Sequence, residues 1–211
     1  MSIWLHRTMW GLMLLLSLAI GSYAVAFFFV DSLGGPEFKS RFATIPWSSR
    51  GHIILGGLCL MLGSLQFSRS LRVRFPLAHR WTGRAYLSCV MISGIGALFM
   101  APISDGGPVA HVGFGMLAVV WLYSGANAYL YIRARNIKQH QRWMIRNFAL
   151  TLAAVTLRLH LPMLQGAFGL SFEQAYPIVA WLAWVPNLLI AEWFILATPR
   201  ATASTAAGQV L

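Results

Sequence analysis

Four histidines occur as two pairs whose placement could hold a flat metal cofactor. His52 and His111 open two similar apolar segments, residues 51–58 and 110–117. His79 and His140 each come just before the pattern Arg-Trp-x-x-Arg, which precedes two further apolar runs. Because paired imidazoles serve as the axial ligands of haem iron, these positions predict one or two b-type haems. The expected ligand pairs are His52 with His111 and His79 with His140.

Arginines and glycines close to these histidines fit the same interpretation. Arginine binds carboxylates through its planar fork of donors, and haem carries two carboxylate groups. A glycine one helical turn after a histidine would leave room for a macrocycle, as at Gly56, Gly83 and Gly115, whereas Met144 follows His140. We therefore expect cofactor contacts from five arginines: Arg80, Arg84, Arg142, Arg146 and Arg158.

Other interpretations of these polar residues remain open. His160 follows His140 by 20 residues, or roughly 30 Å along a helix, which places it at the depth of His52 and His111. Those three imidazoles could instead bind zinc, copper or iron in a non-haem membrane enzyme. In a third interpretation no cofactor is bound, and the histidines and Arg158 line the polar route of a transporter or lipid-interacting protein. No residue indicates catalysis by itself.

The composition decides the kind of fold that must position these residues. The 211 residues are 58% hydrophobic and only 10% charged, whereas soluble domains are about 25% charged. This excludes an ordinary soluble domain and a disordered chain. A helix needs roughly 20 apolar residues to cross a bilayer. We predict an all-α membrane protein with six transmembrane helices, near residues 8–30, 51–68, 81–103, 111–132, 144–168 and 176–197.

The basic residues predict how this bundle lies in the membrane. The net charge is +11, and most of the arginines fall in residues 69–84 and 133–146, which follow the second and fourth spans. The connections at residues 104–110 and 169–175 carry none. By the positive-inside rule both termini are cytoplasmic, in a bacterial inner membrane. The charge therefore indicates topology and contact with anionic lipid rather than nucleic acid.

The similar segments predict an internal repeat. Spans two and three (residues 51–103) correspond to spans four and five (residues 110–168), as two helical hairpins that form a four-helix core. Residues 1–200 would make one domain, followed by a disordered tail at 201–211. By depth, Glu192 of the sixth span should pair with Arg84 or Arg146.

Two resemblances accompany these motifs. Residues 79–86 and 140–146, with Leu157 and Arg158, resemble a bacterial family of multi-span membrane proteins of unknown function, over residues 51–192. The order of histidines on spans two to five is similar to that in cytochrome b561-type di-haem electron carriers. This second resemblance implies electron transfer across the membrane or with a quinone or another redox partner. A homodimer is also compatible with the sequence.

Overall fold

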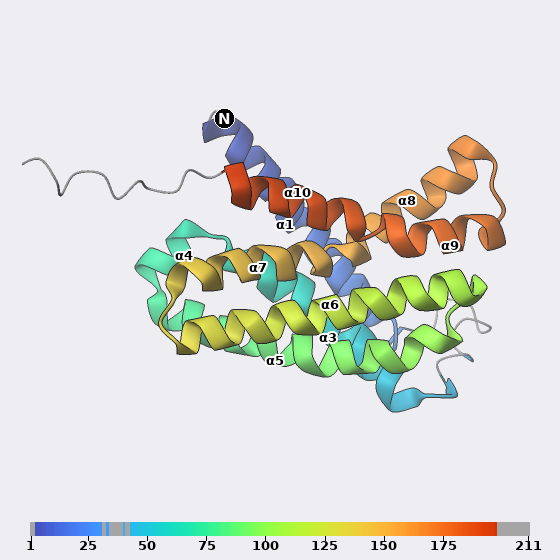
Figure 1. The fold of residues 1–211 in the computed structure, drawn as a ribbon, viewed down its shortest axis with the longest axis horizontal. Coiled ribbons are helices and arrows are strands. Elements are labelled where there is room, and N and C mark those ends of the chain that lie inside the picture. Colours follow the sequence, from blue (N-terminus) through green and yellow to red (C-terminus); the bar gives the residue numbers. More distant parts are fainter. Residues whose placement is uncertain (1–2, 31–32, 34–39, 41–42, 198–211) are drawn as a thin grey trace, which may run out of the picture.

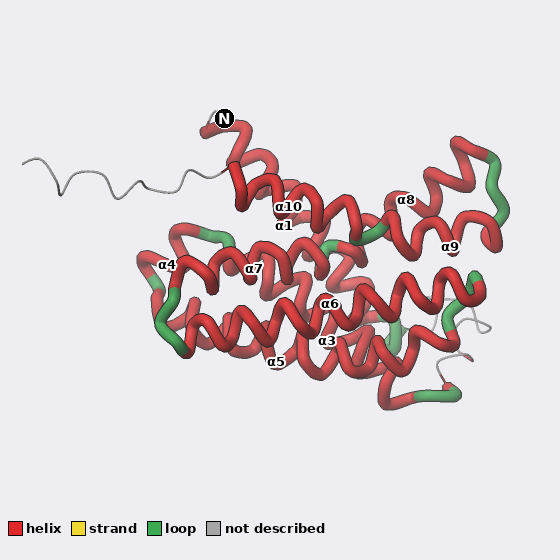
Figure 2. The backbone as a smooth tube through the Cα atoms, viewed as in Figure 1, coloured by secondary structure: helices red, strands yellow, loops and turns green. Residues whose placement is uncertain are grey.

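The computed structural model describes residues 3–30, 33, 40 and 43–197, and in these residues it contains helices and no strand. Figures 1 and 2 show the helices as a bundle with one hairpin extending beyond it. The helices are α1 (Ile3–Ala26), α3 (Pro46–Gln66), α4 (Arg69–Arg74), α5 (Pro76–Met100), α6 (Gly107–Arg133), α7 (Ile137–Thr151), α8 (Ala153–Phe168), α9 (Phe172–Leu182) and α10 (Val185–Ala197). The predicted tail, residues 201–211, lies outside the described part of the chain.

The all-α prediction is confirmed, and five of the described segments are long and apolar enough to cross a membrane. They are Thr8–Ala26, Pro76–Ile103, Gly107–Arg133, Ile137–Phe168 and Phe172–Ala197. Helix α3 corresponds to the second predicted span, residues 51–68, but is not among the five. Its ends include Arg50, His52 and Gln66, which lower its mean hydropathy although its length of 21 residues would suffice. The count of six crossings therefore stays a prediction.

Prolines and polar caps place several helix ends. Helices α3, α5 and α6 each have a proline in their first two positions, where the missing N–H costs no hydrogen bond. Helix α8 ends at Gly169, whose φ of +67° suits glycine. Ser171 then caps α9, and its backbone N–H is bonded by Gln174 in return. The break between α7 and α8 falls at Leu152, whereas Pro162 lies inside a continuous α8.

Helices α3, α5, α6 and α7 form a closed four-helix core. Helix α3 packs against α5, α5 against α6, α6 against α7, and α7 back against α3. Helices α3 and α6 consequently lie across the core from each other, as do α5 and α7. This is the arrangement expected of two related hairpins, although the repeat itself stays a prediction. Helix α1 covers α3, α9 lies on α6, and α10 lies on α7.

The end of the bundle that carries α4 and the α6–α7 connection is called here the arginine-rich end (Figure 1). It contains Arg69, Arg72 and Arg74 of α4 and Arg133 and Arg135 of the connection. The connections α5–α6 and α8–α9 lie at the opposite end (Figure 1). The fold therefore gathers the basic residues on one side, as the topology prediction requires.

Helices α1 and α3 touch backbone to backbone, which yields a first testable prediction. A Cβ on Gly21 would lie 2.7 Å from the Gly57 carbonyl oxygen, whereas a Cβ on Gly11 would meet nothing within 4 Å. We expect Gly21→Ala to lower the free energy of unfolding by about 1–3 kcal/mol, because close glycine contacts hold membrane helices together. Gly11→Ala on the same helix is the matched control and should be neutral or slightly stabilising. Thermal unfolding in detergent measures both, and equal midpoints would contradict the prediction.

Candidate functional site

A cavity of about 270 Å³ lies inside the bundle, on the side away from the arginine-rich end. Its walls come from α1, α3, α5, α6, α7, α8 and α9, which are distant in sequence but converge here. Most of the lining is apolar and small, including Gly56, Ala97, Ala118 and Ala154. Such a volume is close to the lower limit for sites that take drug-sized ligands. The cavity is therefore the first candidate for a binding site.

His52 lines this cavity in a fixed orientation. Its Nδ1 atom lies 3.1 Å from the carbonyl oxygen of Ser93, and the Ser93 hydroxyl donates to the His52 carbonyl at 2.9 Å. With Nδ1–H donated to a backbone carbonyl, Nε2 is the nitrogen left for a ligand. Metal-binding histidines are commonly oriented by this kind of contact.

His111 lies beside the cavity but not in its lining. Its Nε2 atom is 2.8 Å from the carbonyl oxygen of Ser104, and Ser104 itself lines the cavity. Phe114 and Ala118, three and seven residues further along α6, also line it, so His111 is on the face of α6 that turns to the cavity. In this structure His52 of the predicted outer pair lines the cavity and His111 does not. The Nε2 atom of His111 contacts the Ser104 carbonyl oxygen instead.

Gly56 and Gly115, the glycines one turn after His52 and His111, have different surroundings. Gly56 lines the cavity, and a Cβ there would meet the Ser93 hydroxyl at 3.3 Å. Gly115 is not part of the lining, and the nearest atom to a Cβ there is the Ala101 Cβ at 3.8 Å. Gly56 therefore does contribute space to the cavity, while Gly115 does not.

Arg158 places a positive charge at the edge of the cavity. It lines the cavity together with Tyr176, and its Nη1 donates to the Ala154 carbonyl at 2.9 Å. Its guanidinium is 5.7 Å from the centre of the Tyr23 ring. In the described part of the chain no carboxylate forms an ion pair with Arg158. Arg158 is exposed in the structure, and an arginine within a span is a functional candidate, because a charge inside a bilayer is costly.

The second predicted pair, His79 and His140, lies at the arginine-rich end, near the starts of α5 and α7. His140 Nδ1 lies 2.8 Å from the Ala128 carbonyl oxygen, whereas His79 Nδ1 is buried without a hydrogen-bond partner among the described residues. Each is the fourth residue of its helix, so the two histidines lie at the same end of the bundle, and their pairing stays a prediction.

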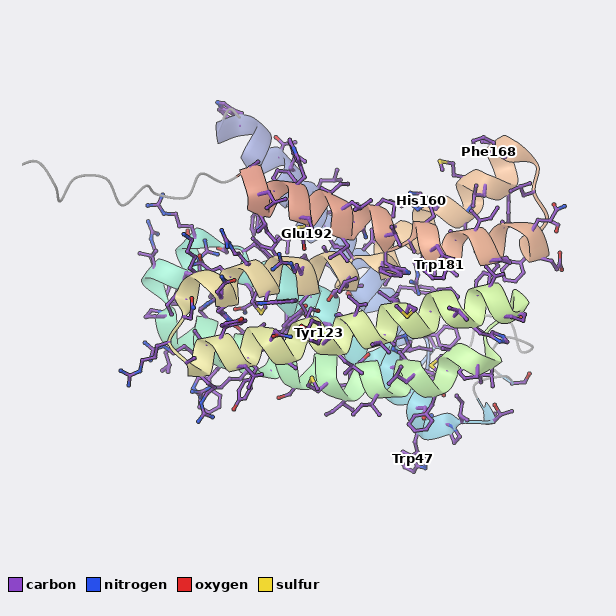
Figure 3. The ribbon with its side chains drawn as sticks, viewed as in Figure 1. Trp47, Tyr123, His160, Phe168, Trp181 and Glu192 are labelled. Carbon is purple, nitrogen blue, oxygen red and sulfur yellow. The ribbon has the colours of Figure 1, made fainter. Side chains whose placement is uncertain are left out.

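The arginines near this pair have different partners. Arg146 of α7 forms a two-pronged ion pair with Glu192, through Nε to Oε1 and through Nη2 to Oε2 at 2.8 Å. Figure 3 labels Glu192 on α10. The predicted pairing of Glu192 is therefore confirmed for Arg146. Arg146 is consequently occupied and not free for a cofactor carboxylate. Arg84 instead lies over the Trp81 ring at 4.9 Å. Arg80 is exposed and Arg142 half-buried.

A buried polar network between the two histidine pairs was missed by the sequence analysis. The Tyr86 hydroxyl donates to Asn147 Oδ1 at 2.6 Å and lies 2.9 Å from Thr151 Oγ1. Trp121 Nε1 donates to the same Thr151 oxygen at 2.9 Å, and Asn147 Nδ2 bonds Ser124 Oγ at 2.8 Å. Thr151 and Trp121 also line the cavity, so the network reaches it.

One sequence signal could have revealed this network. Tyr86 follows His79 by seven residues on α5, and Asn147 follows His140 by seven residues on α7. Seven residues are two helical turns, so each polar residue shares a face with the histidine before it. The contact between Tyr86 and Asn147 shows that these two faces of α5 and α7 turn toward each other.

The three-histidine metal site is not formed. No group of three or more His, Cys, Asp or Glu side chains among the described residues could hold a metal ion. His160 is on α8 (Figure 3), outside the cavity lining, and its Nδ1 is buried without a hydrogen-bond partner among those residues. The depth estimate assumed one continuous helix from His140 to His160, whereas the structure breaks it at Leu152 between α7 and α8.

Comparison with known proteins identifies a family. No curated protein and no solved structure matches the chain. Residues 50–195 match the family described as "Predicted membrane protein (DUF2306)". This segment holds five of the six predicted spans, all four paired histidines and the cavity-lining residues of α3 to α9. The chain therefore belongs to the DUF2306 family of predicted membrane proteins.

Proposed function

We propose that the protein binds b-type haem in the cavity through His52 and transfers electrons across or within the membrane. The observation that carries this proposal is His52 itself, with Nδ1 held by a backbone carbonyl and Nε2 left for iron inside an apolar cavity. Haem, when bound, supplies a one-electron redox couple. The chain's own role is to hold the macrocycle, fix the ligand ring and exclude water.

The surroundings of His52 support this assignment. Gly56, Ala97 and Ala118 give the cavity small, apolar walls, which a macrocycle needs. Arg158 at the edge offers a guanidinium to a propionate. The contact between His52 and Ser93 fixes the imidazole plane before any ligand arrives, which lowers the entropy lost on binding.

In this proposal the other three paired histidines are further haem ligands. His111 would become the second axial ligand by exchanging its contact with the Ser104 carbonyl for iron, since it already lies on the correct face of α6. His79 and His140 would hold a second haem, a role supported by the unpartnered Nδ1 of His79. A quinone or a protein partner would exchange electrons with the site.

Arg158 favours a second candidate function without haem. A cation at the edge of an apolar cavity, with no carboxylate partner among the described residues, also suits a lipid-like molecule with an anionic or carbonyl head group. In that case the protein would bind or move lipids, and Arg158 would donate to the head group.

An absorption spectrum of the detergent-purified protein tests the proposal. We expect a Soret band, a sharp reduced α-band with dithionite, and one haem per chain by pyridine haemochrome, or two if the second pair is also filled. A colourless protein from haem-sufficient cells, which also fails to take up added haemin, would overturn the haem proposal and leave the lipid-binding candidate.

A further inference from the structure

The motif Arg-Trp-x-x-Arg occurs once on α7 and once on α5, and its surroundings differ. On α7 the second arginine, Arg146, is held by Glu192 and lies 4.7 Å from the Trp143 ring. Trp143 is itself covered by Tyr123, with ring centres 5.5 Å apart. On α7 the protein itself supplies the carboxylate that pairs with the arginine and the aromatic ring that packs against the tryptophan.

On α5 the same two side chains face outward. Arg84 lies 4.9 Å from the Trp81 ring, in the same arrangement as Arg146 and Trp143. Trp81 is 60% exposed, Arg84 is also exposed, and no carboxylate among the described residues pairs with Arg84. The α5 copy therefore lacks the anion that the α7 copy has.

The face of α5 that carries this pair is exposed and largely apolar. Positions spaced three or four residues apart share a helix face, and on this face the exposed residues are Leu77, Trp81, Arg84, Ser88, Ile92, Ile95 and Phe99. Arg84 is the charged residue of an otherwise largely apolar stripe. Tryptophan and arginine near the end of a span are suited to the head-group region of a bilayer.

We propose that Arg84 and Trp81 bind the phosphate of an anionic phospholipid at the arginine-rich end of the bundle. The lipid phosphate takes the place that the Glu192 carboxylate has at Arg146, because arginine pairs with phosphate as it does with carboxylate. The acyl chains lie along the apolar part of the stripe. The nearby arginines of α4 add positive potential that favours an anionic over a zwitterionic lipid.

A free phosphate ion fits these surroundings less well. Trp81 and the apolar stripe contribute contact area to an acyl chain and none to a small ion. The proposed occupant is therefore the whole lipid. This inference does not depend on haem, because the α5 stripe is separate from the lining of the cavity.

Native mass spectrometry of the purified chain with phosphatidylglycerol or phosphatidylcholine tests the proposal. We expect retention of phosphatidylglycerol in preference to phosphatidylcholine, and about five-fold weaker binding after Arg84→Gln, the factor expected for one basic residue at a membrane surface. Trp81→Leu should weaken binding as well. Arg135→Gln is the matched control, since it removes an exposed arginine from the same end, in the α6–α7 connection.

Three results would overturn the inference. The first is equal loss of phosphatidylglycerol in Arg84→Gln and Arg135→Gln, which would indicate unspecific charge attraction. The second is equal retention of both lipids by the unmodified chain. The third is displacement of the lipid by millimolar inorganic phosphate, which would assign the site to the free ion.

Discussion

His52→Ala is expected to remove the haem spectrum of the purified protein. Its imidazole lines the cavity with Nδ1 held by the Ser93 carbonyl, so no other described side chain offers iron a nitrogen in the same place. Loss of even an outer partner of a metal ligand costs about 10- to 100-fold in affinity, and loss of the ligand itself should cost at least as much. The haem content by pyridine haemochrome should fall by more than about ten-fold.

His160→Ala is the matched control for this substitution. His160 is likewise a half-buried histidine within a span, but it does not line the cavity. Its removal should leave the Soret band and the haem content unchanged. Equal loss of haem in both variants would point to a general folding defect. Full haem content in His52→Ala would show that the ligand assignment is wrong.

His111→Ala separates the two ligand positions. If His111 leaves Ser104 to become the second axial ligand, its loss converts a six-coordinate low-spin spectrum into a five-coordinate high-spin one while haem remains bound. An unchanged spectrum would leave His52 as the single protein ligand from this pair.

Asn147→Leu should have the largest effect on stability. Asn147 is fully buried and makes three hydrogen bonds to other helices, with the Tyr86 hydroxyl, the Trp121 carbonyl and the Ser124 hydroxyl. At roughly 0.6–1 kcal/mol for each such bond in a membrane protein, the free energy of unfolding should fall by about 2–3 kcal/mol. Leucine has a similar volume, so the loss reflects polar contacts more than packing. Thermal unfolding in detergent measures it.

The same change at Asn127 provides the control. Asn127 lies on α6, and its side chain bonds the Tyr123 carbonyl one turn earlier in its own helix at 2.8 Å. Asn127→Leu removes no contact between helices and should shift the unfolding midpoint little. If both variants unfold at the same temperature, the network around Asn147 does not hold α5, α6 and α7 together.

Properties that depend on distance along the chain were predictable from residue types. The apolar runs predicted the helices, because each run is long enough to span a bilayer and few charges interrupt it. Depth predicted that Glu192 pairs with Arg84 or Arg146, since the rise per residue of a helix is fixed, and the structure has the pair with Arg146. The placement of His79 and His140 at one end of the bundle followed in the same way.

Properties that depend on helix rotation and separation were not predictable. The depth of His111 was known, but only the packed structure shows that its Nε2 atom meets the Ser104 carbonyl instead of the cavity. The same holds for His160, which lies at a given height on α8 but outside the cavity lining. Such contacts depend on rotations of a few tens of degrees about a helix axis. The periodicity of hydrophobic residues does not determine the rotation of a helix that closely.

The sequence by itself therefore determined that this chain is a helical membrane protein with its basic residues at one end and its histidines at two depths. The tertiary structure alone decided which of those histidines reaches a cavity, that Arg158 stands at its edge, and that Tyr86, Asn147 and Thr151 join three helices between the two pairs. The physical reason is that hydrophobicity and helix rise act along one chain. Cavities and buried hydrogen bonds, in contrast, depend on how closely several helices approach, and small residues from different segments set that distance.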